Sequence, residues 1–271
     1  MKIDLNKVLI TGANGMVGSY VDFGIKAGRE SFDITNMSQV VSFIEKLKPM
    51  AVLHLAAETN MEKCENDPSH AYLVNTVGTY NLATAAKLVG AKMIYVSTDA
   101  VFPSSNTSHT KKDKEQPKSI YGHSKYLGEL AVIGLSDDYV IARTSWVFGG
   151  GKEKDNKFVG KFIAQLDNSE AKAVNDQFNS PTYAKDLVEA LKKLISDNKS
   201  GTFHVANSGR ASRYDVTEVM VKTLNKKIKI LPVSASTYGL LPYQESSGGL
   251  IGDVGLRSWQ EALVEYLENE W

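Results

Sequence analysis

The sequence predicts an α/β fold: a Rossmann-type doubly wound parallel sheet with helices on both faces, joined to a smaller C-terminal lobe. Three observations predict it. Short apolar runs alternate with helical stretches through the first half of the chain, and a glycine-rich turn follows the first of these runs. The alternation then weakens after the run Gly149-Gly150-Gly151. Strands that alternate with helices form parallel sheets, because each crossover helix packs back onto a face of the sheet.

The first half of the chain supplies most of the expected strands. Apolar runs that end at glycine or at polar residues predict buried parallel strands at 8–11, 51–55, 93–97 and 139–143. Helices are expected at 16–23, 68–89 and 121–135. The second of these helices begins beside Asp67, a good N-cap, and ends at Gly90. The stretch from Gly18 to Asp33 is short, so no full strand is expected within it.

The second half of the chain has fewer strand signals and a mixed order. Helices are expected at 157–166, 182–195, 212–224 and 258–270, and strands at 202–206 and 229–231. Pro181 stands at a helix start, where its fixed φ is suitable. We therefore expect a main domain over 1–150, with later returns of the chain, and a smaller lobe over 151–271 that packs on the open edge of the sheet.

Composition narrows the partners and the compartment. The 271 residues carry 31 Lys+Arg and 31 Asp+Glu, and this zero net charge argues against nucleic acid or an anionic membrane as the main partner. The single cysteine, Cys64, cannot form an intramolecular disulfide, which fits the cytoplasm. We find no secretory signal and no apolar run near the roughly 20 residues of a membrane helix. The histidines have no metal-site spacing, so no metal is expected.

The glycine-rich turn predicts a dinucleotide site. Gly12, Gly15 and Gly18 follow a strand and open a helix, and that context gives the spacing its meaning. Gly12 permits a tight turn, Gly15 lets the backbone approach a pyrophosphate, and Gly18 lets the helix sit close to the strand. The candidate cofactor contacts in this turn are Gly12, Asn14, Gly15, Met16, Val17 and Gly18. The first domain is therefore expected to bind a dinucleotide, and the lobe mainly the substrate.

Two later segments add candidate cofactor contacts. Asp33 and Ile34 have the spacing of the acid that binds the adenosine ribose, and Arg29 could hold a 2′-phosphate. Arg29 favours NADPH over NADH only weakly, so both cofactors stay open. Small residues after the strand at 51–55 let a ligand lie against the backbone at the carboxyl edge of the sheet. This second group is Leu55, Ala56, Ala57 and Thr59.

Tyr121 and Lys125 are the candidate catalytic pair. They are four residues apart on an expected helix and so share one face. Tyr121 would supply a proton, and the Lys125 cation would lower the tyrosine pKa from its usual value near 10. Thr98 and Asp99 end a strand at the same sheet edge, where a hydroxyl can hydrogen-bond a substrate carbonyl. With the glycine turn, these residues predict a nicotinamide-dependent enzyme that moves a hydride and a proton at a carbonyl or an alcohol.

The G-x-x-G-x-x-G spacing and the Tyr-x-x-x-Lys pair resemble the extended short-chain dehydrogenase/reductases. Within that family the chain resembles the dTDP-4-dehydrorhamnose reductase branch, from about residue 7 to the helix at Trp259. The runs that carry this resemblance are 11–18, 32–35, 54–58, 75–79, 97–102, 121–125, 143–149 and 175–182. The Ser-Thr-Asp-x-Val-Phe run and the Asn-Asp-Gln-Phe…Pro-Thr run are the most specific of them.

The resemblance implies reduction of the 4-keto group of a dTDP-6-deoxysugar to give dTDP-L-rhamnose. Hydride would come from the nicotinamide and the proton from Tyr121. Thr98 and Asp99 would contact the sugar, with Trp146 beside it. The positions that match cofactor contacts of the family are Gly15, Met16, Asp33, Ile34, Ala56, Ala57, Tyr121 and Lys125. Some members of the branch are dimers, so a homodimer is also open.

Departures from the family pattern lie on the substrate side. The run at 240–246 lacks the usual arginine before its proline, Ala100 stands where tyrosine is common, and the polar segment 103–118 lacks the usual aromatic residue. Two alternatives therefore remain open. One is another nucleotide-sugar reductase or epimerase of the same fold. The other is a non-catalytic NADP-binding regulatory subunit, since the regulatory subunit of methionine adenosyltransferase resembles this branch too.

Overall fold

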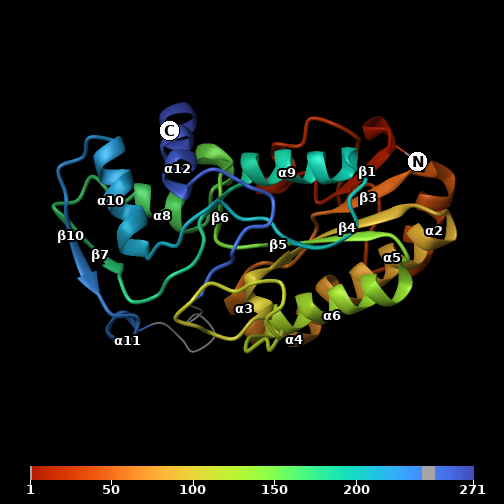
Figure 1. Cartoon of the computed structure of the whole chain (residues 1–271), viewed down its shortest axis with the longest axis horizontal. Coiled ribbons are helices and arrows are strands. Elements are labelled where there is room, and N and C mark those ends of the chain that lie inside the picture. The colour runs from red at the N-terminus through yellow and green to blue at the C-terminus, as the bar shows by residue number, and fades with distance from the viewer. Residues whose placement is uncertain (1, 240–247) are drawn as a thin grey trace.

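A six-stranded parallel sheet forms the body of the molecule (Figure 1). The computed structural model describes residues 2–239 and 248–271. The strand order is β2-β1-β3-β4-β5-β9, and every neighbouring pair is parallel. The bounds are β1 Val8–Thr11, β2 Ile25–Ala27, β3 Ala51–His54, β4 Lys92–Thr98, β5 Tyr139–Thr144 and β9 Gly201–His204. The predicted α/β class with a doubly wound parallel sheet is confirmed.

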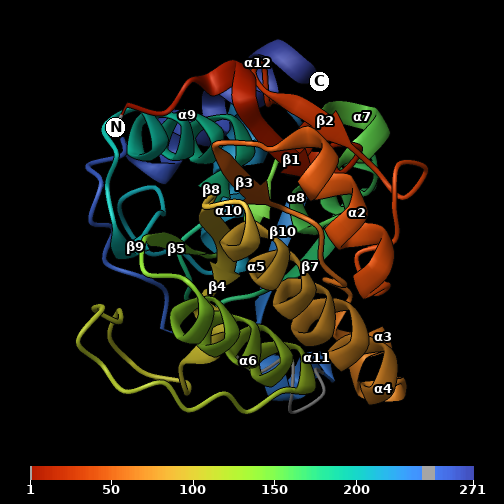
Figure 2. The same cartoon turned by 90° about the vertical axis from the view of Figure 1, so that its right-hand side faces the viewer.

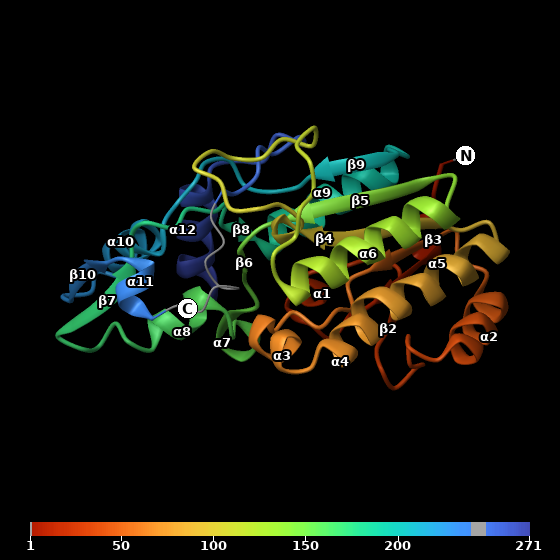
Figure 3. The ribbon, with the colours of Figure 1, turned by 90° about the horizontal axis from the view of Figure 1, so that it is seen from below.

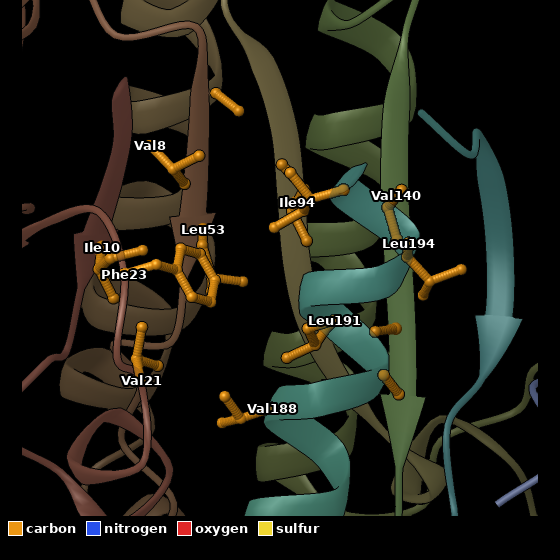
Figure 4. Packing of buried hydrophobic residues seen from close by; sticks show 14 of the residues in the cluster. Val8, Ile10, Val21, Phe23, Leu53, Ile94, Val140, Val188, Leu191 and Leu194 are labelled. Carbon is orange, nitrogen blue, oxygen red and sulfur yellow. The ribbon is translucent and has the colours of Figure 1, made fainter. Parts of the chain in front are cut away.

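Alternate residues of each strand pack on opposite faces of the sheet, as the pleat requires. On β1, Val8 and Ile10 join one core cluster, whereas Leu9 joins the other. The first cluster is covered by α9 (Ala184–Ser196), whose Leu191 and Leu194 lie over the strands in Figure 4. Both faces are thus apolar and buried, which explains why the strands read as continuous apolar runs.

The second face is covered by helices α2, α5 and α6, which lie side by side in Figure 2. Their bounds are α2 Met37–Leu47, α5 Gly78–Leu88 and α6 Ile120–Leu135. Ser119 caps α6, its hydroxyl accepting a hydrogen bond from the Gly122 amide at 3.0 Å. This cap fixes the first turn of α6, which carries Tyr121 and, one turn later, Lys125.

A smaller lobe stands at one end of the sheet (Figure 3). Its core contains Phe148, Phe162, Tyr183, Trp259 and Tyr266. Two small parallel sheets belong to this region, one pairing β7 (Glu170–Val174) with β10 (Lys229–Val233), the other β6 (Val147–Phe148) with β8 (Thr182–Tyr183). The helices are α7 Gly151–Lys154, α8 Phe158–Ile163, α10 Arg213–Thr223, α11 Ala235–Tyr238 and α12 Trp259–Glu270. After β8 the chain returns to the main sheet through α9 and β9 before α10.

The segment after the glycine turn differs from the prediction. The helix expected over 16–23 is only α1, Met16–Ser19. It ends early because Val21 and Phe23 are drawn into the core beside β1, and Gly24 turns the chain with φ +71°. A three-residue strand, β2, fits between Gly18 and Asp33 where no full strand was expected.

The helix expected over 68–89 forms, but its backbone hydrogen-bond pattern changes along its length. It comprises α4 (Pro68–Tyr72), a π-helical stretch (Leu73–Val77) and α5. Asn75, inside the π-helical stretch, bonds to the Glu58 backbone and to the Ser124 hydroxyl on α6. Such π-helical turns commonly mark places where a side chain is needed for a specific contact.

Some elements are absent from the prediction. Helix α2 was not predicted, although Val40 and Ile44 have helical spacing. Strand β7 was not predicted either, although its buried residues nearly alternate. Helix α3 (Met61–Asn66), which leads into α4, was also not predicted. In the described part of the chain, no helix combines the length and apolarity that crossing a membrane demands.

A buried ion pair fastens α6 to β5. Arg143 donates to both carboxylate oxygens of Glu129, at 2.9 Å through Nε and 2.6 Å through Nη2. Nη2 also reaches Glu115 at 2.5 Å, and the guanidinium lies 5.0 Å from the Phe102 ring centre. Glu129 is completely buried, whereas the Glu115 side chain is 24% exposed.

A second long-range contact ties the end of α12 to the glycine turn. Tyr20, directly after α1, donates to both Glu270 oxygens, at 2.8 and 2.6 Å. Tyr183 hydrogen-bonds the same carboxylate, and the Gly150 amide donates to the Tyr20 hydroxyl at 2.5 Å. Burial and Glu270 raise the pKa of Tyr20 above its usual value, so the phenol keeps its proton for this contact.

We expect Glu129→Ala to destabilise the fold far more than Glu115→Ala. The first change leaves Arg143 buried without its main partner and should cost about 3–5 kcal/mol of unfolding free energy. The second removes a partly exposed partner and should cost about 1 kcal/mol. Urea unfolding followed by circular dichroism measures both. Equal losses in the two variants would contradict the assignment.

Candidate active site

A pocket of about 460 Å³ lies at the carboxyl ends of the parallel strands, between the sheet and the lobe. This is where open α/β sheets bind ligands. Its walls come from the glycine turn, the segments after β3, β4 and β5, the start of α6, and lobe elements α8 and α10. The pocket is therefore assembled from segments more than two hundred residues apart in the chain.

The glycine turn fits a dinucleotide because two of its glycines have no room for a side chain. A Cβ at Gly12, where φ is +71°, would lie 2.5–2.8 Å from the Leu55–Ala56 backbone. A Cβ at Gly18 would lie 2.5 Å from the carbonyl oxygens of Gly12 and Ala13. At Gly15 the added Cβ would meet one protein atom at 3.3 Å. Gly15 thus keeps the pocket side of the turn free for a phosphate group.

Tyr121, Thr98 and Asp99 meet inside the pocket. Tyr121 and Thr98 both line the pocket, and the Thr98 hydroxyl acts to lower the pKa of the Tyr121 phenol. The Thr98 hydroxyl also donates to Asp99 at 3.1 Å and accepts from the Ala100 amide at 3.1 Å. Ser145, at the end of β5, donates to the other Asp99 oxygen at 2.6 Å. The four side chains come from three elements, so their positions are fixed by the packing of β4, β5 and α6.

The pKa of Tyr121 differs in direction from the expectation. Burial raises it above the usual value, the Thr98 hydrogen bond lowers it, and the Asp99 carboxylate raises it further. Burial also raises the pKa of Asp99, against the lowering effect of Ser145 and Thr98. In this geometry Tyr121 is held as a neutral phenol, the form that can donate a proton.

Lys125 lies one helical turn from Tyr121 and faces the sheet. Its Nζ donates to the Val96 carbonyl at 2.8 Å and lies 4.1 Å from the centre of the Tyr95 ring. Burial lowers the pKa of Lys125 from 10.5 to about 7, and Glu129 opposes that shift. Lys125 was expected to lower the pKa of Tyr121, but it is not among the groups that shift that pKa.

The lobe adds two cations and an aromatic side chain. Arg213 of α10 lies 5.5 Å from the Trp146 ring centre and 5.6 Å from that of Phe158. Lys157 donates to the Thr59 hydroxyl at 3.0 Å, so it bridges the lobe and the segment after β3. Burial lowers the pKa of both cations. Trp146 has a φ of +37°, an uncommon conformation for a bulky residue and a mark of strain at functional sites.

Most of the candidate residues line this pocket. Those in its wall are Gly12, Gly15, Met16, Val17, Gly18, Leu55, Ala57, Thr59, Thr98, Asp99, Tyr121, Lys125 and Trp146. The other candidates lie outside that wall. The Ala56 backbone packs behind Gly12, and the Ile34 side chain packs against Gly78. Asn14, Arg29 and Asp33 lie toward the end of β2. Ser145, Lys157 and Arg213 also line the pocket but were not predicted as site residues; of the three, Ser145 alone lies in a run that carries the family resemblance.

The structure describes only some of the positions on the substrate side at which the sequence departs from the family pattern. Residues 240–246, which lack the expected arginine, lie outside the described residues. Ala100 is buried and lines the pocket, and its carbonyl packs against Gly122 of α6. Within 2–239 and 248–271, no group of three or more histidine, cysteine or acidic side chains is arranged for a metal ion.

Known proteins match this chain over nearly its whole length. The family model described as the RmlD substrate binding domain matches residues 6–270. The spore coat polysaccharide biosynthesis protein SpsK of Bacillus subtilis (strain 168) is 35% identical, across 97% of this chain and 98% of its own length. The dTDP-4-dehydrorhamnose reductase of Mycolicibacterium smegmatis is 34% identical, across 96% of this chain and 84% of its own length.

A solved structure agrees with these relatives. The dTDP-4-dehydrorhamnose reductase (rfbD) of Bacillus anthracis str. Ames, in complex with NADP, superposes with a TM-score of 0.88 at 33% identity, covering 97% of this chain and 99% of its own. The resemblance stated from the sequence is thereby confirmed. Since the family model spans the fold and the pocket together, the chain belongs to the RmlD substrate binding domain family, within the extended short-chain dehydrogenase/reductases.

Proposed function

We propose that this chain reduces the 4-keto group of a dTDP-4-dehydro-6-deoxysugar, converting dTDP-4-dehydro-L-rhamnose to dTDP-L-rhamnose. The observation that carries the proposal is that Tyr121, Lys125 and Thr98 line one pocket together with the glycine turn. The relatives named dTDP-4-dehydrorhamnose reductase support the choice of substrate. NADPH or NADH, bound by the glycine turn, would supply the hydride to C4.

Residues of this chain supply the proton and bind the carbonyl oxygen. Tyr121 delivers its proton to the C4 oxygen as hydride reaches the carbon. Thr98 hydrogen-bonds the same oxygen when the substrate replaces Asp99 as the acceptor of its hydroxyl proton. Because burial keeps Tyr121 neutral, the proton is present when substrate binds. Lys125 lines the same pocket one helical turn from Tyr121, with its Nζ bonded to the Val96 carbonyl. Asp99 accepts from Ser145 and Thr98 and so positions the Thr98 hydroxyl.

The lobe side of the pocket suits a nucleoside diphosphate. Lys157 and Arg213 bring two positive charges into the wall, and a diphosphate is the anionic part of the substrate. Trp146 and Phe158 provide flat apolar faces beside them, suited to the sugar or the base. These features fit the diphosphate and the rings of a nucleotide sugar, whichever base it carries.

We also propose a cytoplasmic location and no nucleic-acid partner. Cys64, the single cysteine, is buried and free, as expected for a chain kept in a reducing compartment. Positive and negative residues balance at 31 each, so the chain lacks the excess of cations that nucleic-acid binders carry.

A homodimer through α5 and α6 is our proposal for the assembly. Apolar side chains of these two helices and of the π-helical stretch before α5 are 40–46% exposed: Leu73, Val77, Tyr80, Leu130 and Ile133. The first three have helical spacing, and α5 and α6 lie side by side in Figure 3. Large apolar patches are uncommon on monomers, and a two-fold axis would cover this one with its own copy.

We expect Tyr121→Phe to reduce turnover by about 10²- to 10⁴-fold, the usual worth of a general acid. Oxidation of NADPH and NADH at 340 nm with dTDP-4-dehydro-L-rhamnose measures it, and cofactor binding should stay intact because only a hydroxyl is removed. A parallel panel with other bases and sugars tests the alternative substrates. Cofactor binding without turnover on any ketosugar would leave the regulatory-subunit alternative standing instead.

We expect Lys125 to make the fold more stable as pH rises above 7. Its pKa is about 7 in the folded protein but 10.5 when unfolded, so between these values the unfolded chain binds the extra proton. Unfolding free energy should therefore rise by up to about 1.4 kcal/mol per pH unit from this group. Urea titrations at pH 7 and 9, compared with Lys125→Met, isolate it. Parallel pH dependence of the two proteins would rule out the shifted lysine.

We expect light scattering after size-exclusion chromatography to give twice the 29.7 kDa chain mass. Val77→Glu combined with Ile133→Glu should halve that mass, because charges would be buried at the centre of the interface. Ile251→Glu, at an exposed apolar residue elsewhere, serves as the control and should leave the mass unchanged. A monomeric wild type would refute the interface.

A further inference from the structure

Glu270, the last residue of α12, holds two phenols behind the glycine turn. The Tyr20 hydroxyl donates to its Oε1 at 2.8 Å and to its Oε2 at 2.6 Å, and the Tyr183 hydroxyl donates to Oε1 as well. Burial raises the pKa of both phenols above the usual range, and the bond to Glu270 raises it further. Both tyrosines therefore keep the protons that they donate to this carboxylate.

Tyr20 is the residue at which α1 ends, and its backbone is tied to that helix. The Tyr20 amide donates to the Val17 carbonyl at 3.2 Å. Helix α1 has four residues, and three of them, Met16, Val17 and Gly18, line the pocket. A displacement of Tyr20 would therefore reach the pocket wall within one helical turn.

The Tyr20 hydroxyl also holds the turn that follows β6. It accepts a hydrogen bond from the Gly150 amide. A Cβ at Gly149, where φ is +138°, would lie 3.0 Å from the Tyr20 hydroxyl oxygen, so this close approach needs glycine. A Cβ at Gly150 would lie 3.4 Å from Cγ of Met16 in the pocket wall. One phenol thus joins α1, the turn at 149–151 and the end of α12.

We propose that Glu270 is a positioning residue for the cofactor site: by holding Tyr20 from behind, it fixes α1 and the turn at 149–151 where a bound dinucleotide needs them. The inference rests on the proposed function, because it takes the glycine turn as the dinucleotide site. Glu270 does not line the pocket, so it acts through Tyr20 and not by contact. Tyr121 is carried by α6, which a different ion pair fastens, Arg143 with Glu129. Glu270 therefore affects the affinity for the cofactor and not the proton transfer.

Removal of the carboxylate tests this separation. Glu270→Ala takes the acceptor from two phenols, so the dissociation constants of NADPH and NADH should rise about tenfold, the worth of one hydrogen bond. Isothermal titration calorimetry measures them without any catalysis. In the 340 nm assay the cofactor KM should rise by the same factor, while kcat at saturating cofactor stays within about twofold of the wild type.

Two further variants show whether the contact itself is responsible. Glu270→Gln keeps an Oε1 that can accept from both phenols, as the Oε1 of Glu270 does, so cofactor affinity should return to within about threefold of the wild type. Tyr20→Phe removes the donor and should weaken the cofactor as much as Glu270→Ala does. The double variant should bind no more weakly than Tyr20→Phe alone, because both changes break one contact.

Glu268→Ala is the matched control, since Glu268 is exposed on the same turn of α12. It should leave both dissociation constants unchanged. Unchanged cofactor affinity in Glu270→Ala would overturn the proposal, and so would a loss of kcat as large as the loss of affinity, which marks a general loosening of the fold. Should Glu270→Ala fail to fold, Tyr20→Phe and Glu270→Gln decide the matter: equal affinity in these two variants would overturn the proposal.

Failure of this inference and failure of the proposed function give different results. If cofactor affinity depends on Glu270 while no ketosugar is reduced, Glu270 keeps its role and the reaction is wrong. If the ketosugar is reduced with the same cofactor KM in every variant, the reaction stands and the positioning role falls.

Discussion

The ion pair between Arg143 and Glu129 is the contact on which the geometry of the site depends. It joins β5, which ends at Ser145 and Trp146, to α6, which carries Tyr121 and Lys125. Two charges buried this deeply are tolerated only when their hydrogen bonds are made, so the pair accepts few alternative arrangements. The register of α6 against the sheet, and hence the distance from Tyr121 to Thr98, follows from it.

The pocket joins two kinds of chemistry that come from different parts of the chain. The sheet edge supplies backbone turns and hydroxyls, which suit phosphates and a carbonyl oxygen. The lobe supplies Arg213 and Lys157 between aromatic faces, which suit a second anionic group. Neither half forms the full wall alone.

The sheet could be predicted, and the candidate catalytic residues proposed, because their signals are local. Gly12 and Gly18 are required by backbone contacts within one turn, and Tyr121 and Lys125 by one helical face. Arg213 and Lys157 could not be found this way, since only tertiary folding brings them to the pocket. The shortened α1 and the strand β2 depend on the pull of the core on Val21 and Phe23.

The bond from Tyr20 to Glu270 spans nearly the entire chain. Tyr20 ends the short helix behind the glycine turn, and the same carboxylate receives Tyr183. The two partners are 250 residues apart in the chain, so the contact behind the glycine turn can form only after both segments have been synthesised. The β9 strand, at 201–204, also joins the sheet from far along the chain. Contacts between such distant segments slow folding, because a long loop must close before they form.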